Sequence, residues 1–252
     1  MQNREQKILS ILNQGKLLLK ETAKELGVSE MTLRRDLHNL EERKLLIQVK
    51  GGAVPYPRIL EPQNASGQES PVKANIAAAA YKKIMPCKTL YLGSGTTVKA
   101  FAKQILAGDV EHITVITNSL PSAAILFQSP HQIILLGGEL RSESLDLIGA
   151  AAERNIENYF VDWLIMGCDS VSIEDGFYTA DPGMANLEIK SIKIAQHVAI
   201  VTESSKFGRR SFAKFAHLQD IDLLVTDDQL PDSQCQILQD NGIDVVRVPS
   251  VV

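Results

Sequence analysis

Seven short apolar runs, rich in β-branched residues and separated by stretches with helical spacing, most constrain the fold of this chain. They are TLYL (89–92), ITVIT (113–117), QIILL (132–136), DWLIMG (162–167), HVAIVT (197–202), IDLLVT (221–226) and IDVVRV (243–248). Continuous apolar runs that alternate with helices are typical of strands buried on both faces of a mostly parallel sheet. The sequence therefore predicts a large α/β domain.

A polar connector precedes this domain. The segment NASGQESPVK (64–73) is surrounded by prolines, which are Pro55, Pro57, Pro62 and Pro71. A region with so many prolines cannot hold a long helix or a central strand. We expect a first domain at residues 1–57, a linker at 58–74 and the α/β domain at 75–252.

Charge and composition exclude several classes of protein. No stretch reaches the roughly 18–20 apolar residues of a membrane span, so we expect a cytoplasmic protein without membrane contact. Residues 1–56 hold ten Lys and Arg against seven Asp and Glu, although the whole chain has a formal net charge of −4. The cysteines Cys87, Cys168 and Cys235 are odd in number and far apart, which indicates neither a disulfide framework nor a metal site. We interpret them as small buried apolar residues and expect no metal or cofactor.

The amino-terminal part begins with an amphipathic helical pattern. The stretch REQKILSILNQG ends at Gly15, a residue that commonly stops a helix. One face of this helix collects Ile8, Leu9, Ile11 and Leu12.

Two further short helices and a hairpin follow. KETAKELG is bounded by Gly27, and VSEMTLRRDLHNLEERK has Ser29 in position to cap its first turn. Two helices joined by a glycine-containing turn predict a helix-turn-helix. The next segment, LLIQVKGGAV, has a turn at Gly51-Gly52 between β-formers, which predicts a wing.

The third helix carries adjacent arginines, Arg34 and Arg35. At roughly 100° per residue, Leu33, Leu37 and Leu40 fall within about 60° of one another and predict the buried face. The opposite face then holds Met31, Arg35 and His38. Arginine can donate two hydrogen bonds to guanine from a helix in the major groove, so we expect Arg35 to read bases.

Other residues of this part suit phosphate contacts. Ser29, Thr32, Arg34 and the wing residue Lys50 can fix the position of the protein on DNA without reading its sequence. An isolated Arg-Arg pair more often only solvates a surface helix. The glycine turn, the capping serine and the following hairpin favour DNA binding here. The candidate DNA-binding residues are Ser29, Met31, Thr32, Arg34, Arg35, His38 and Lys50.

A family resemblance rests on these residues. The stretch from Leu17 to Val54 resembles the winged helix-turn-helix of the DeoR family of bacterial transcription regulators, whose hallmark is V-S-x-x-T-hydrophobic-R-R-D-L followed by a glycine-glycine wing. The matching residues are Val28, Ser29, Thr32, Leu33, Arg34, Arg35, Asp36, Leu37, Gly51 and Gly52. The resemblance implies a DNA-binding repressor of a carbohydrate catabolism operon, and not an enzyme.

Polar loops follow several of the predicted strands. The first, Gly93-Ser94-Gly95-Thr96-Thr97, offers backbone N–H groups at a helix N-terminus, which suits a phosphate. In an open α/β sheet, loops at the carboxyl ends of the strands can converge on one ligand. Each loop alone is compatible with ordinary turn chemistry. The candidate effector-binding residues are Gly93, Ser94, Gly95, Thr96, Thr97, Asn118, Ser119, Gly138, Asp169 and Lys206.

The DeoR resemblance extends over roughly residues 76–230. It implies a sensor domain similar in fold to ribose-phosphate isomerases and CoA-transferases, which binds a phosphorylated sugar. Three features depart from the family pattern: Gly93 stands where an aspartate is common, Ser170 stands where a glycine is common, and Gly183-Met184 followed by Glu188 replaces acidic residues followed by a lysine.

Two functional hypotheses follow. In the first, the chain is a ligand-controlled repressor that binds a palindromic operator in double-stranded DNA as a homodimer or homotetramer. In the second, it is a sugar-phosphate isomerase-like enzyme with Asp169 and Glu203 as candidate bases. An enzyme would have no use for residues 1–56, so we favour the repressor.

Overall fold

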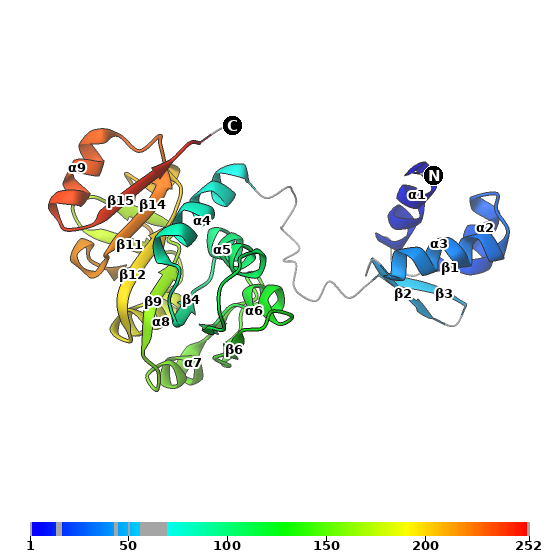
Figure 1. Ribbon diagram of the computed structural model, residues 1–252, viewed down its shortest axis with the longest axis horizontal. Coiled ribbons are helices and arrows are strands. Elements are labelled where there is room, and N and C mark those ends of the chain that lie inside the picture. Colours follow the sequence, from blue (N-terminus) through cyan, green and yellow to red (C-terminus); the bar gives the residue numbers. More distant parts are fainter. Residues whose placement is uncertain (1, 14–16, 43–44, 50, 56–69, 251–252) are drawn as a thin grey trace. The chain divides into compact units, whose positions relative to one another are not determined.

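Two units divide the chain, at Met1–Glu61 and Pro62–Val252. The computed structural model describes residues 2–13, 17–42, 45–49, 51–55 and 70–250. Figure 1 shows both units and labels their helices and strands where there is room. The division falls inside the predicted linker.

The first unit has the predicted helices and wing. Its elements are α1 (Gln2–Asn13), β1 (Leu17–Leu18), α2 (Leu19–Glu25), α3 (Glu30–Glu42), β2 (Leu46–Val49) and β3 (Gly52–Pro55). Strands β2 and β3 form an antiparallel hairpin, and β1 adds a third strand beside β3. The approach of β1 is so close that a Cβ atom on Gly52 would lie 1.8 Å from the carbonyl oxygen of Leu17. The predicted helix end at Gly15 lies outside the described residues.

A leucine stripe fixes the rotation of α3. Leu33, Leu37 and Leu40 are at most 2% exposed, whereas Met31 on the same helix is 81% exposed. The stripe packs in one cluster with residues of the other elements, including Ile8, Leu12, Leu17, Ala23, Leu46 and Ala53. The rotation predicted from helical spacing is therefore confirmed.

Two polar contacts join α3 to its neighbours. Arg4 of α1 donates to both carboxylate oxygens of Asp36, at 2.7 and 3.1 Å. At the carboxyl-terminal end of α3, Glu41 accepts hydrogen bonds from the backbone N–H and the side-chain amide of Gln48, at 2.7 and 2.8 Å. These hydrogen bonds lower the pKa of Glu41, and the bond from the backbone N–H has the larger effect. The helix is thus tied to α1 at its middle and to the wing at its carboxyl-terminal end.

The second unit is built on a seven-stranded sheet in which every neighbouring pair is parallel. Its spatial order is β15-β14-β12-β9-β4-β5-β6. The strands are β4 (Thr89–Leu92), β5 (Thr114–Thr117), β6 (Gln132–Leu135), β9 (Val161–Met166), β12 (Ala195–Val201), β14 (Leu223–Asp227) and β15 (Asp244–Val248). All seven apolar runs in the sequence form strands of this sheet, so the predicted α/β fold is confirmed.

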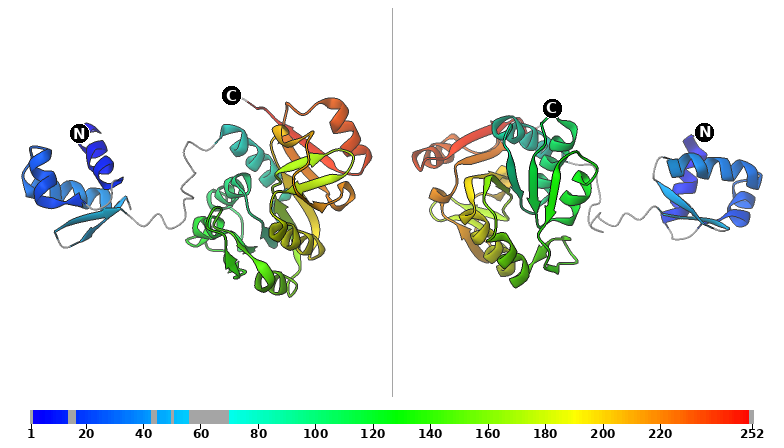
Figure 2. Two further views of the ribbon diagram at one scale, coloured as in Figure 1. Left: turned by 180° about the vertical axis from the view of Figure 1, so that it is seen from behind. Right: turned by 60° about the horizontal axis from the view of Figure 1, so that its bottom comes forward.

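Helices cover both faces of the sheet, as the views in Figure 2 show. One face packs against α4 (Pro71–Ile84), α5 (Thr96–Ala107) and α6 (Leu120–Leu126). The other face packs against α7 (Gly149–Ile156), α8 (Pro182–Lys193) and α9 (Asp232–Asp240). Strand residues that alternate in direction supply both clusters. Leu164 packs in the cluster with α7, α8 and α9, and Ile165 packs in the cluster with α4, α5 and α6. Burial on both faces explains why the strands are apolar throughout.

Several short elements were not predicted. A second, antiparallel sheet consists of β10 (Ser170–Ser172), β11 (Gly176–Thr179) and β13 (Ala213–Ala216), and it packs Phe177 and Phe215 into the core. A hairpin pairs β7 (Glu139–Leu140) with β8 (Leu147–Ile148). Two 3₁₀ turns, η1 (Ser204–Lys206) and η2 (Leu218–Asp220), complete the unit. The segments of the antiparallel sheet are interrupted by polar residues or glycine, and the strands of the hairpin have two residues each, so none of them shows the continuous apolar run that marks the seven predicted strands.

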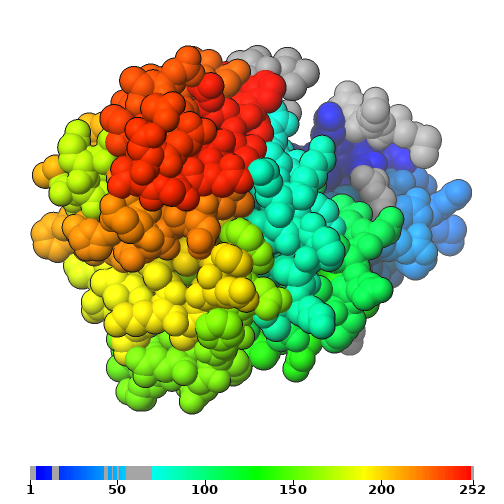
Figure 3. All heavy atoms as spheres, turned by 60° about the vertical axis from the view of Figure 1, so that its left-hand side comes forward, coloured from blue at the N-terminus to red at the C-terminus, as the bar shows by residue number. Residues whose placement is uncertain are grey.

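The predicted linker extends too far. Helix α4 begins at Pro71, so the last residues of the expected 58–74 segment are helical. Proline is tolerated in the first turn of a helix, where its missing N–H has no partner to lose. At its other end, Lys83 of α4 donates to Asp244 of β15 at 2.7 Å. Figure 3 shows α4 in cyan directly beside the red carboxyl-terminal strand.

We expect Leu37→Ala to lower the free energy of unfolding of the first unit by about 2–5 kcal/mol, because it leaves a cavity in the leucine stripe. Hydrogen exchange of α3 amides in the full chain measures this loss. Met31→Ala, on the exposed face of the same helix, is the matched control and should change stability by no more than about 0.5 kcal/mol. Equal protection of α3 in both variants would contradict the packing described.

Candidate functional site

The amino-terminal end of α3 has the predicted capped geometry. The Ser29 hydroxyl oxygen accepts a hydrogen bond from the backbone N–H of Thr32 at 3.1 Å, and the two hydroxyl groups lie 2.9 Å apart. This cap fixes the start of the helix at the position predicted from sequence. Both hydroxyl groups lie at the end of α3 where the helix dipole favours an anion.

Basic side chains project from the exposed face of α3. Arg34, Arg35 and His38 are exposed, and neither arginine forms an ion pair with any residue that the structure describes. The His38 imidazole lies 3.7 Å from the Glu42 carboxylate, one turn further along. Two unpaired guanidinium groups on an exposed helix face are suited to an anionic partner. The predicted wing contact, Lys50, lies outside the described residues.

The second unit has a crevice where the strand order reverses. From β4 the chain moves outward through β5 to β6, then returns to pair β9 with the other side of β4 and continues through β12 to β15. The loops that follow β4 and β9 therefore leave the sheet in opposite directions. Ligands of open α/β sheets bind at this kind of switch point.

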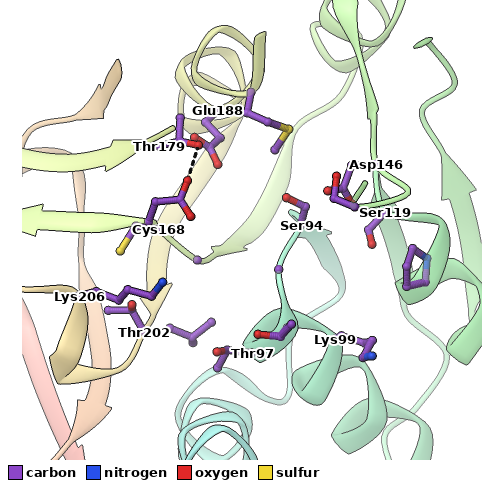
Figure 4. A pocket seen from close by; sticks show the side chains of 18 of the residues that line it. Ser94, Thr97, Lys99, Ser119, Asp146, Cys168, Thr179, Glu188, Thr202 and Lys206 are labelled. Atoms are coloured by element: carbon purple, nitrogen blue, oxygen red, sulfur yellow. Dashed lines mark hydrogen bonds between the residues drawn. The ribbon is translucent and has the colours of Figure 1, made fainter. Parts of the chain in front are cut away.

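A cavity of about 470 Å³ occupies this crevice. Figure 4 shows side chains from several segments converging on it. The predicted effector-binding residues that line it are Ser94, Gly95, Thr96, Thr97, Ser119, Asp169 and Lys206. Its volume lies within the usual range for small-molecule sites, roughly 300–1,000 Å³.

The other predicted effector residues are not among those that line the cavity. Gly93 is buried, and a Cβ atom there would lie 3.2 Å from that of Met166. Asn118 is 1% exposed and donates its amide to the carbonyl of Leu147. Gly138, with φ +127°, packs against the Ile148 carbonyl. These residues shape the loops and do not line the cavity.

One side of the cavity is suited to an anion. Helix α5 starts there without a side-chain cap and without an acidic residue in its first turn. Its backbone N–H groups and positive dipole end are thus open to a ligand. Lys99, in the first turn, and Lys206 form no ion pair with the residues that the structure describes.

Lys206 is held in place by its own 3₁₀ turn. The backbone N–H and hydroxyl of Ser204 both donate to the Asp227 carboxylate, at 2.7 Å each. This double contact fixes η1 to the end of β14. The Lys206 side chain therefore extends from a rigid turn rather than from a free loop.

The opposite side of the cavity is acidic. Asp169 accepts hydrogen bonds from the Thr179 hydroxyl at 3.1 Å and the Ala180 N–H at 2.7 Å. Asp146 is buried, and this burial raises the pKa of its carboxyl group. Glu188 of α8 has a pKa raised well above the ordinary value, first by burial and then by the charges of Asp169 and Asp146.

Much of this lining was missed at the level of sequence. The missed side chains include Lys73, Lys99, Arg141, Asp146, Cys168, Thr179 and Thr202. Glu203 also lines the cavity and was considered only as a base for the isomerase hypothesis. Lys99 could have been found, because it lies one helical turn beyond Thr96 on the same face. Arg141 and Asp146 come from the unpredicted β7–β8 hairpin, and Met184 and Glu188 were noted only as departures from a family pattern.

The cysteines are all free thiols. Cys235 is buried as predicted, while Cys87 and Cys168 are partly buried. Burial raises the pKa of the Cys87 and Cys168 thiols to about 12. Among the described residues no group of three or more His, Cys, Asp or Glu is arranged to hold a metal ion. Within the same part of the chain, none of the helices has the length and apolar character of a membrane span.

Comparison with known protein families gives matches in both units. Residues 4–56 match the family described as the DeoR-like helix-turn-helix domain, and residues 68–228 match the DeoR C terminal sensor domain. The HTH-type transcriptional repressor GlcR of Bacillus subtilis is 34% identical over 95% of this chain and 93% of its own length. The glycerol-3-phosphate regulon repressor of Escherichia coli is 29% identical over 92% of this chain and 93% of its own length.

Among solved structures, ribose 5-phosphate isomerase A from Neisseria gonorrhoeae aligns with a TM-score of 0.42 and 16% identity, covering 57% of this chain and 56% of the isomerase.

We expect Glu188→Gln to make the protein more stable than the wild type at neutral pH. Because the folded pKa of Glu188 is raised, its contribution to stability is complete below its ordinary pKa and is lost as the pH rises through the folded value. Glutamine does not ionise, so the variant does not lose this stability as the pH rises. The difference in melting temperature between the variant and the wild type should therefore shrink toward acidic pH.

Thermal denaturation of both proteins across a pH series measures the effect. Glu111→Gln, at an exposed acid away from the cavity, is the control and should follow the wild type. Identical pH profiles for Glu188→Gln and wild type would show that Glu188 is not held in the environment described.

Proposed function

Because the chain belongs to the DeoR family of transcriptional regulators, we propose that it represses a carbohydrate catabolism operon under the control of a phosphorylated sugar. It is a regulator rather than an enzyme. The residues considered as bases for an isomerase have structural partners instead: Asp169 holds Thr179 and Ala180, and Glu203 lies 3.5 Å from Lys73. The names of both relatives above describe repressors.

One observation carries the effector part of this proposal. The cavity at the switch point combines an uncapped helix N-terminus with two lysines that have no acidic partner among the described residues. A phosphate dianion would receive hydrogen bonds from backbone N–H groups and charge from Lys99 and Lys206. The rest of the cavity has space and polar groups for a sugar.

The operator part depends on the exposed face of α3. Arg35 would read a guanine in the major groove, while Arg34 and the Ser29 hydroxyl contact phosphates. A helix-turn-helix that reads both halves of a palindrome needs two copies of the chain, so we propose a homodimer or homotetramer.

The effector can act on the start of α4. Lys73 lies in the first turn of this helix, shortly after the connector. It forms an ion pair with Glu203, and both residues line the cavity. Glu203 is separated from Lys206 by only two residues. A phosphate bound at Lys206 would repel Glu203 and attract Lys73, which weakens the pair between them. Binding would thus change the relative populations of two arrangements at the amino-terminal end of α4.

For the operator, we expect Arg35→Ala to weaken specific binding by about 1–3 kcal/mol and to relax the preference at one base pair. Mobility-shift titrations against operator variants measure both effects. Arg34→Ala is the matched comparison: it should weaken binding to all sequences alike and reduce the salt slope by about 1. Intact specificity in Arg35→Ala would overturn the groove assignment.

For the effector, we expect sugar phosphates to raise the melting temperature of the protein, and the corresponding free sugars to leave it unchanged. A ligand at ~100 times its dissociation constant adds roughly 2.7 kcal/mol. Lys206→Ala should weaken binding of the same compounds by roughly 1.5–3 kcal/mol, the value of a hydrogen bond to a charged group.

Lys193→Ala removes an exposed lysine outside the cavity and serves as the control. The phosphate assignment fails if free sugars and sugar phosphates shift the melting temperature equally, or if Lys206→Ala binds as the wild type does.

A further inference from the structure

The cavity has opposite charges on its two sides. Lys99 and Lys206 lie on one side, with the start of α5, and Glu188 and Thr179 lie across from them in Figure 4. Asp146 and Asp169 extend the acidic side. The sugar part of a phosphorylated ligand would therefore meet three carboxyl groups.

Glu188 differs from its acidic neighbours in having a buried oxygen without a hydrogen-bond partner among the described residues. Part of its side chain is accessible from the cavity, yet its Oε2 atom is buried and makes no hydrogen bond among the described residues. Asp169 accepts its hydrogen bonds from Thr179 and Ala180 on one oxygen, Oδ2. A buried carboxyl oxygen without a partner is costly, so a missing donor is the simplest completion of this site.

The nearby arginine does not supply that donor. Arg141 lies 3.4 Å from Asp181 and 3.6 Å from Glu143, and both pairs direct its guanidinium to other carboxylates. Asp181 also caps α8 by accepting from the Met184 N–H at 3.0 Å. The groups that face Glu188 are thus Asp146, Asp169 and Asp181, with Arg141 as the opposing positive charge.

This excess of negative charge favours a charged ligand group over a neutral one as the hydrogen-bond donor to Glu188. A hydroxyl group could satisfy one oxygen but would leave the charges of Asp146 and Asp169 uncompensated. An ammonium group donates up to three hydrogen bonds and carries the opposite charge. A phosphate on the Lys99 side and an ammonium on the Glu188 side would match both ends of the cavity.

We propose that the effector is a phosphorylated compound that also carries a protonated amine, and that Glu188 is the residue that selects the amine. This inference rests on the proposed function, because it specifies the ligand of the same cavity. The amine pairs with ionised Glu188, so a Glu188 that is protonated in the free protein releases its proton when the ligand binds.

The test uses two pairs of probes that differ only in an amine or a hydroxyl. Glucosamine 6-phosphate is compared with glucose 6-phosphate, and serinol phosphate is compared with glycerol 3-phosphate. Titration calorimetry with the full chain should show that the amine member of at least one pair binds about tenfold or more tightly than its hydroxyl partner.

The variant Glu188→Gln should abolish this preference and leave binding of the hydroxyl member within about threefold of the wild type, since the phosphate contacts are untouched. The titrations should be done at about pH 6, which is below the ordinary pKa of such an amine, so that the amine is protonated before it binds. Repeating them in buffers with different ionisation enthalpies measures how many protons are released on binding. Because the second pKa of a phosphate monoester is about 6, binding of the dianion releases a fraction of a proton from the ligand in both proteins. Wild type should release more protons on binding the amine than Glu188→Gln does. A purely structural role for Glu188 would not produce this difference.

The outcomes separate the two proposals. If the hydroxyl members bind as well as the amines, or if Glu188→Gln keeps the preference for the amine, the ammonium assignment is wrong and the phosphate cavity stands. If neither pair binds and inorganic phosphate does not bind either, both the ammonium assignment and the phosphate cavity are wrong. If inorganic phosphate binds and neither pair does, the ammonium assignment alone is wrong.

Discussion

Parallel pairing of the sheet strands is the constraint on which the sensor unit depends. Seven strands that run in one direction must all end at the same edge, so the chain turns there after each of them. Because the strand order reverses between β4 and β9, the turns after these two strands leave the sheet in opposite directions, and a cavity lies between them. The anion-binding side comes from the turn after β4 and the start of α5. The acidic side comes from α8, from the β7–β8 hairpin and from the turn after β9, which are far apart in sequence.

Helix α3 separates two functions among adjacent residues. Within the stretch from Arg34 to Leu37, Arg34 and Arg35 are exposed and Leu37 is buried. Asp36, between them, accepts a hydrogen bond from Arg4 of α1. The helical rotation of roughly 100° per residue is sufficient to produce this division. The basic face is available to a partner because the other residues of the same stretch hold the helix against its own unit.

The sequence was most informative where a pattern repeats over several residues. The apolar runs predicted all strands of the parallel sheet, and helical spacing predicted the buried face of α3. The antiparallel sheet lacked such a pattern because polar residues or glycine interrupt its strands, and the β7–β8 hairpin lacked it because each strand has only two residues. The environment of Glu188 could not be predicted either, because it is created by Asp146, Asp169 and Asp181 from three separate segments. Position after a strand was not sufficient to predict the cavity lining. Gly93 and Asn118 both follow strands of the sheet, yet Gly93 is buried, the Asn118 amide donates to the Leu147 carbonyl, and neither residue lines the cavity.

The two glycines of the wing have different physical reasons for being glycine. Gly51 has φ +89° and open space around its α-carbon, whereas Gly52 sits against the Leu17 carbonyl with no room for a methyl group. Any side chain at Gly52 would force β1 away from β3 and disturb the whole hairpin. A genetic screen scored only by loss of DNA binding would thus recover Gly52 substitutions alongside true contact mutants. Measuring how well each mutant folds would be needed to tell the two groups apart.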